Sequence, residues 1–180
     1  MKNLSKRSTL ILVSFVALAL VIAGGVFQYN HIQQREREQR QAALAADTQN
    51  FKVVMKQASG LRLQKRYAEA NIVLKAYNSK ALSVQNKTDA LISTAINYEM
   101  IGDNKTAYAT YLEAEKLSPK ENYAIYFGAA RSAETAADHG SALKYYQKCL
   151  KMLQALKPDD VNQSDIEMIM NDIKTQESKV

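Results

Sequence analysis

The sequence predicts an all-α protein with an N-terminal transmembrane helix, an α-solenoid of three helical hairpins and a C-terminal capping helix. Two patterns indicate this fold class. The stretch from Thr9 to Phe27 is apolar and free of charge, and small and aromatic residues then recur. Their interval of about 35 residues is typical of a helix–turn–helix repeat. With six glycines and two prolines in 180 residues, the chain has few turn residues, so we expect helices rather than strands.

The first element is the apolar stretch, residues 9–27. A helix rises about 1.5 Å per residue, so a helix of this length approaches the ~30 Å hydrocarbon core of a bilayer. Lys2, Lys6 and Arg7 precede it without an acidic residue. This asymmetry predicts a cytoplasmic N-terminus, residues 1–8, and an extracytoplasmic C-terminal domain at a bacterial-type plasma membrane. The same three residues equal half of the net charge of +6, so the charge is weak evidence for nucleic-acid binding and none is expected.

A cleaved signal peptide is the alternative for this stretch. Val21 and Ala23 fit the positions before a cleavage site at Gly24, and cleavage would release a secreted soluble binding protein. The apolar run continues through Val26 and Phe27, beyond a typical signal-peptide core. That length favours an uncleaved signal anchor.

Residues 28–46 are a charge-rich run of strong helix formers, mainly Gln, Arg, Glu and Ala. Apolar positions are too sparse there for a coiled-coil seam, so we expect a solvated helical stalk. Pairing of such stalks or of the end helices between copies remains an alternative. The protein would then be a self-associating structural membrane protein, a homo-oligomer.

Three hairpins are expected within residues 47–157, at about 48–82, 87–119 and 121–157. The middle hairpin has the clearest pattern, because small residues at a helix crossing allow close approach and tyrosines fill the space between hairpins. Its pattern residues are Leu91, Ala95, Tyr98, the turn glycine Gly102, Ala107, Tyr111, Ala114 and the terminating Pro119.

The flanking hairpins repeat this pattern more loosely. Downstream, Ala142 aligns with Ala107, and Ala137 replaces the turn glycine. Upstream, Lys65 stands at the turn, and a loop from Ser79 to Lys87 leads into the middle hairpin. The recurrence predicts a stack of hairpins.

These residues resemble the tetratricopeptide repeat (TPR) family over roughly residues 48–157. Thr94 departs from the pattern, because a leucine is usual at its position. The resemblance implies that the first helix of each hairpin lines a concave groove that binds a protein or peptide partner. Carried over position by position, it selects Lys52, Met55, Arg62, Ile92, Ile96, Glu99, Met100, Phe127 and Arg131.

Five of these residues form an apolar strip and three supply cations along its edge. A peptide with apolar anchors and some acidic groups would suit such a surface. The lysine and asparagine placements of the two-carboxylate clamp found in chaperone-binding relatives are not reproduced. The alternative is that the protein's own stalk or end helix covers the strip.

The C-terminal residues 164–178 are expected to cap the stack, because its last apolar face needs a helix with a polar back. Ser164 and Glu167 form a capping-box pattern. The apolar stripe of this helix is Ile166, Ile169, Met170 and Ile173.

Catalytic chemistry finds no support in the sequence. His31 falls in the stalk and His139 in a turn, where solvated side chains are expected, and Cys149 fits a buried small position. No metal-ligand spacing, phosphate loop or nucleophile elbow is present, so no enzyme, metal or cofactor is expected. We therefore expect a membrane-anchored TPR scaffold or adaptor that binds its partner at the extracytoplasmic membrane surface.

Overall fold

A computed structural model describes residues 6–118, 120–156 and 162–180, with side chains from Gly25 onward. These residues form seven α-helices and no strand, which confirms the all-α prediction for the described part of the chain. The chain divides into two compact units, Met1–Ala45 and Ala46–Val180. Each unit is described by itself.

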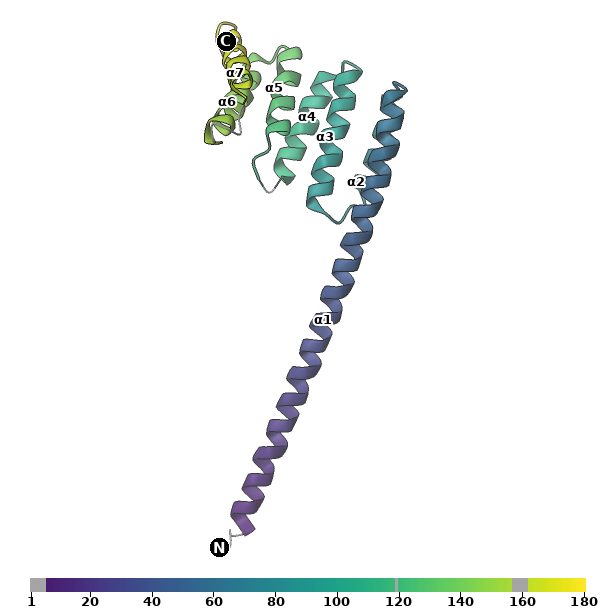
Figure 1. Cartoon of the computed structure of the whole chain (residues 1–180), viewed down its shortest axis with the longest axis vertical. Helices are drawn as coiled ribbons and strands as arrows, with labels where there is room; N and C mark the ends of the chain where they lie inside the picture. The colour runs from purple at the N-terminus through teal and green to yellow at the C-terminus, as the bar shows by residue number, and fades with distance from the viewer. Residues whose placement is uncertain (1–5, 119, 157–161) are drawn as a thin grey trace. The chain divides into compact units, whose positions relative to one another are not determined.

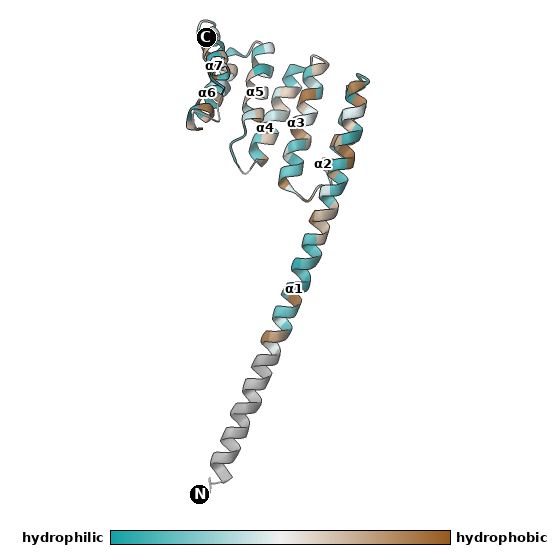
Figure 2. Cartoon of the chain, in the orientation of Figure 1, coloured by the Kyte–Doolittle hydropathy of each residue, from teal (hydrophilic) through white to brown (hydrophobic). Residues whose placement is uncertain are grey.

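The N-terminal unit belongs to α1, Lys6–Leu63, which continues beyond it. The side chains of residues 9–24, most of the predicted membrane helix, lie outside the described residues. Among the described residues, no helix carries a stretch long and apolar enough to cross a bilayer. The predicted stalk, residues 28–46, is helical, and hydrophilic residues predominate along it (Figure 2). Gln34 Nε2 donates a 3.0 Å hydrogen bond to Glu38 Oε1 within it.

The second unit consists of helices that pack one after another along the chain (Figure 1). The last turns of α1 pair with α2 through the apolar residues Ala58, Ala70 and Leu74. The following helices each contact the next, and α3 also contacts α5. Their bounds are α2 Tyr67–Asn78, α3 Val84–Met100, α4 Asn104–Leu117, α5 Tyr123–Thr135, α6 His139–Ala155 and α7 Gln163–Glu177.

The three hairpin turns share one backbone conformation. Lys65, Gly102 and Ala137 have φ angles of 59°, 80° and 61°, in the left-handed region. Glycine reaches this region without steric cost, whereas lysine and alanine do not. The equivalence of these three positions, expected from the sequence, therefore appears in the structure as a common turn geometry.

Side-chain caps start the second helices of two hairpins. Asp103 accepts from Thr106 N at 3.2 Å, and Asp138 accepts from Ser141 N at 3.1 Å. Both carboxylates satisfy an amide that the first helical turn leaves unpaired. The first hairpin differs, because Arg66 stands at the cap position without a capping bond.

Alanines make up much of the buried core, in two clusters. One joins α1, α2 and the start of α3, and the other extends from α3 to α7. At Gly128 the approach is closest, because a β-carbon there would lie 2.2 Å from Cζ of Tyr111. Glycine at this position lets the tyrosine ring lie against the backbone of α5.

The predicted loop from Ser79 to Lys87 is too long, because α3 already begins at Val84. The Ser83 side chain caps α3 by accepting from Asn86 N at 3.3 Å. The carboxylate of Asp47 accepts from Tyr77 OH at 3.0 Å and from Ser83 N at 3.1 Å, and Asn86 Nδ2 donates to it at 3.2 Å. Asp47 thus fastens the loop to α1.

The end helix α7 is present, with two corrections. Its N-cap is Asn162, which accepts from Ser164 N at 3.2 Å, so the predicted capping box at Ser164 is wrong. Ile169 is fully buried as expected, but Met170 is 50 % exposed. Gln176 takes a buried place instead, because its amide finds hydrogen-bond partners there.

Candidate protein-binding surface

The first-helix face is defined here by Met55 on α1, Ile92, Ile96 and Met100 on α3, and Phe127 and Arg131 on α5. These are the apolar and aromatic residues expected to line a groove, together with one cation. Helices α3 and α5 contact each other, so the residues that they supply to this face lie on adjacent helices.

In the structure, only some of the apolar residues of this face pack against the same core cluster. Ile92, Ile96 and Phe127 are half-buried against the larger core cluster. Met55 packs on the separate cluster of the first hairpin. Met100, at 57 % exposed, offers the largest accessible apolar side chain of the α3 row.

Aromatic stacking gives the α5 part of the face a fixed form. Tyr123 and Phe127 stack with ring centroids 5.6 Å apart and planes 9° apart, and Tyr146 meets Phe127 edge-on at 6.4 Å. The exposed Arg131 guanidinium lies 5.8 Å from the centroid of Phe127. A cation over a ring face is attracted by the ring quadrupole, so this contact favours one orientation of the exposed Arg131 side chain. Tyr123 was not among the expected residues, although it stands one helical turn before Phe127.

Two expected site residues bind within the protein. Arg62 donates from Nε to Asn97 Oδ1 at 2.9 Å and from Nη2 to Ser93 Oγ. Glu99 accepts from Ser132 Oγ at 2.8 Å. Part of the hydrogen-bonding capacity of these groups therefore joins neighbouring hairpins. Lys52, by contrast, is exposed on α1.

These contacts belong to a row of charged residues whose common spacing from the hairpin turns was not recognised from the sequence. Arg62, Glu99 and Glu134 each stand one helical turn before a left-handed turn residue, and each bonds a later first helix or α7. Glu134 accepts from Gln176 Nε2 at 2.6 Å and from Tyr146 OH at 2.7 Å. The equal spacing of three charged residues from the turns was the available signal.

Charges on and beside this row shift the pKa values of two nearby acidic groups, Tyr111 and Asp172. Burial raises the pKa of the Tyr111 hydroxyl, and the nearby Glu99 carboxylate raises it further, while Arg131 and Arg62 oppose the rise. Burial likewise raises the pKa of Asp172 on α7, with a contribution from Glu134 and an opposing one from Arg131. The exposed Arg131 thus lowers the pKa values of Tyr111 and Asp172 against the effect of burial.

Two of the groups considered for catalysis, His139 and Cys149, lie within the packed helices. His139 is half-buried rather than solvated as expected, and its Nδ1 lies 2.8 Å from Gln176 Oε1. Burial raises the pKa of the Cys149 thiol to about 12, which keeps it protonated. Within the described residues, no group of three His, Cys, Asp or Glu side chains is placed to hold a metal ion.

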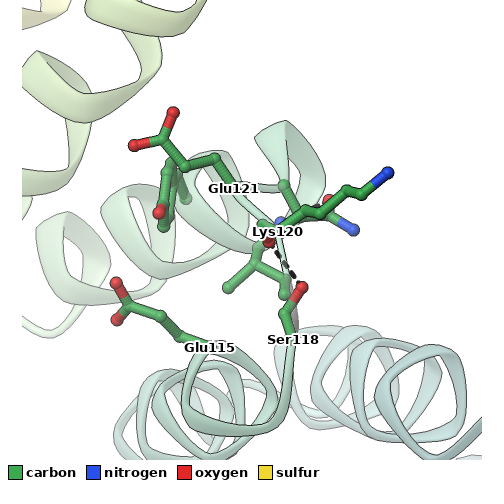
Figure 3. A pocket seen from close by; sticks show the side chains of 7 residues that line it. Glu115, Ser118, Lys120 and Glu121 are labelled. Atoms are coloured by element: carbon green, nitrogen blue, oxygen red, sulfur yellow. Dashed lines mark hydrogen bonds between the residues drawn. The ribbon is translucent and has the colours of Figure 1, made fainter. Parts of the chain in front are cut away.

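A pocket of about 290 Å³ lies where α4 leads into α5 (Figure 3). Two of its polar side chains, Glu115 and Ser118, are bonded within the protein. Glu115 accepts from Tyr145 OH at 2.6 Å and pairs with Lys148, and Ser118 Oγ donates to the Lys120 carbonyl at 2.6 Å. Glu115 thereby links α4 to α6, and the Ser118 bond lies within the connection from α4 to α5.

No family model matches the chain, and no curated protein matches it.

Proposed function

We propose that the protein is a membrane-anchored, TPR-like scaffold or adaptor whose first-helix face binds a protein partner at the extracytoplasmic membrane surface. The observation that supports this most is that two contacting helices, α3 and α5, carry an exposed Met100 and an exposed Arg131 that lies over the Phe127 ring. Aromatic residues, methionine and arginine are enriched where proteins bind one another.

The recognition chemistry follows from the same residues. Ile92, Ile96 and Phe127 are held by the core, so little side-chain entropy is lost when a partner covers them. Arg131 presents planar N–H donors that fit a carboxylate. A partner segment with an apolar anchor beside an acidic side chain suits both features.

Site-specific photo-crosslinking of the full chain in its native membrane tests the proposal. A photoreactive residue at Met100 should give one stoichiometric adduct, and Arg131→Gln in the same chain should reduce it. Leu82, 58 % exposed against 57 % for Met100, is the matched control position and should give none. Equal adducts at both positions, or none at Met100, would contradict the proposal.

The membrane topology has its own test. A reporter enzyme that is active only outside the cytoplasm, fused after Val180, should be active. The intact mass of the mature protein should include residues 1–24. A mass that begins at or after Gly24 would instead identify the secreted form.

A further inference from the structure

A second pocket, of about 310 Å³, lies between α2, α3 and α4. Its volume is at the lower end of the ~300–1,000 Å³ typical of small-molecule sites. It belongs to the second helices of two hairpins and to the α3 residues beside them, and it includes none of the residues that define the first-helix face. Its lining includes Lys75, Asn78, Thr94, Tyr98, Thr110 and Glu113.

Threonines make the inner wall polar. Thr94, at 3 % exposed, stands where the repeat pattern usually has a leucine, which would fill more of this space. Its hydroxyl donates to the Ala90 carbonyl at 2.8 Å, and the Thr110 hydroxyl donates to the Thr106 carbonyl at 2.7 Å. Since each hydroxyl hydrogen is used within its helix, both oxygens retain lone pairs that can accept further bonds.

Asn78 supplies a group that the fold does not satisfy. Its side-chain oxygen is buried and has no hydrogen-bond partner within the described part of the chain. A buried acceptor without a donor costs free energy, and each such group calls for an explanation. Because this oxygen has almost no accessible surface, an N–H donor in the pocket can satisfy it only when the Asn78 side chain, which lines the pocket, turns toward it.

Opposite charges stand at two sides of the same pocket. The Lys75 ammonium donates to Tyr98 OH at 2.7 Å and lies 5.2 Å from the centroid of that ring. Since an ammonium has three N–H donors, Lys75 is held in place with donors left for an anion. Glu113, on α4, contributes a carboxylate. In the pocket of Figure 3, by comparison, Glu115 is already engaged by Lys148 and Tyr145.

We propose that this pocket binds a small zwitterion of the free amino acid class. The ligand's ammonium group would face Glu113 and, with the Asn78 side chain turned toward the pocket, donate to its Oδ1. The ligand's carboxylate would accept from Lys75. The threonine oxygens would accept any remaining ammonium hydrogen. A ligand of this class would therefore pair with all three groups: the Asn78 oxygen, the Lys75 ammonium and the Glu113 carboxylate.

Titration of the full chain in detergent with the standard L-amino acids, one at a time, tests this proposal. The side-chain amide signal of Asn78 in a nitrogen–proton correlation spectrum reports binding at the site. At least one amino acid should shift that signal saturably below about 10 mM, and Lys75→Gln should weaken binding by about tenfold or more. Lys80→Gln, at an exposed lysine outside the pocket, should leave the affinity unchanged.

Thr94→Leu is the decisive variant, because it fills the pocket with the residue usual at that position. It should abolish the binding shift while the melting temperature does not fall. Acetate and methylamine, each carrying one of the two charges, should bind at least about tenfold more weakly than the amino acid. The proposal is overturned if no amino acid binds, if Thr94→Leu binds equally well, or if either half-probe matches the amino acid.

Discussion

The ring of Tyr111 on α4 occupies the space beside Gly128 on α5 that a β-carbon would need, with Cζ 2.2 Å and Cε1 2.5 Å from the ideal position. The ring is buried and belongs to the larger core cluster, so it has little freedom to move away. This contact links the second helix of the middle hairpin to the first helix of the next.

Gly128→Ala should therefore destabilise the fold. Alanine favours a helix over glycine by up to about 1 kcal/mol, but overpacking of a filled core typically costs about 1–3 kcal/mol. We expect a net loss of about 1–2 kcal/mol in the free energy of unfolding, measured by urea denaturation. Gly60→Ala in α1 is the matched control, because nothing lies within 4 Å of its β-carbon position. That variant should be neutral or stabilising, and equal losses at both sites would refute the steric explanation.

The left-handed turns make opposite predictions at equivalent positions. Ala137→Gly should raise the free energy of unfolding by about 1 kcal/mol, because a β-carbon in this conformation is strained. Gly102→Ala should lower it by a similar amount. Thermal melting of the two variants beside the parent chain measures both changes, and changes of the same sign would argue against a shared turn geometry.

Acid should loosen the connection between the first two hairpins. Burial tends to raise the pKa of Asp47, but hydrogen bonds from Ser83 N, Tyr77 and Asn86 outweigh it and hold the pKa below its ordinary value of 3.8. A depressed carboxyl pKa contributes stability above the unfolded-state pKa, and this contribution is lost as the pH falls through the folded-state pKa.

Asp47→Asn should accordingly reduce the stability at pH 7 and flatten its decline in acid. A buried hydrogen-bonding group left without its partner costs about 1–3 kcal/mol. Chemical denaturation between about pH 7 and pH 3 compares the two chains in the range where an aspartate titrates. Parallel pH profiles for parent and variant would show that Asp47 is not the titrating group.

The attachment of α7 should depend on Gln176. Its Nε2 donates to Glu134 Oε1 at 2.6 Å, and its Oε1 lies 2.8 Å from His139 Nδ1. Gln176→Ala therefore removes one hydrogen bond from each of two partly buried groups. We expect faster amide hydrogen exchange across α7, with about 1–3 kcal/mol lost from its local opening free energy. Met168→Ala, at an exposed position of the same helix, should leave exchange unchanged. Equal exchange in the two variants would remove Gln176 from this role.

The hairpins were predictable because their signals are local and repeat. The intervals between Ala70, Ala107 and Ala142 placed the second helices, and the turn residues before them have the same backbone conformation. The start of α3 was misplaced because, beside the local Ser83 cap, two of the bonds that fix it come from Asp47, far away in the chain.

The candidate surface was predictable only in part, because exposure and pairing depend on neighbouring helices. Ile92 and Ile96 were placed by helical periodicity, and they lie half-buried as such positions usually do. Arg62 and Glu99 carried the right charge for ligand contacts, yet they bond Asn97 and Ser132 of the adjoining hairpins. On α7, Gln176 is buried and Met170 is exposed for a related reason. Polar groups of neighbouring helices, such as Glu134, pair with the Gln176 amide.

The charged residues before the turns give the hairpins different polar contacts with the helices that follow them. The first hairpin presents Arg62, with Leu74 where the later ones have a tyrosine, whereas the third presents Glu134 beside the Tyr146 hydroxyl. Glu134 accepts from an amide at a buried position of α7 and Arg62 donates to Asn97, so the modules are not interchangeable despite their common backbone. Exchanging two hairpins would place charged groups opposite side chains that cannot pair with them. The polar contacts between the hairpins therefore determine their order along the stack.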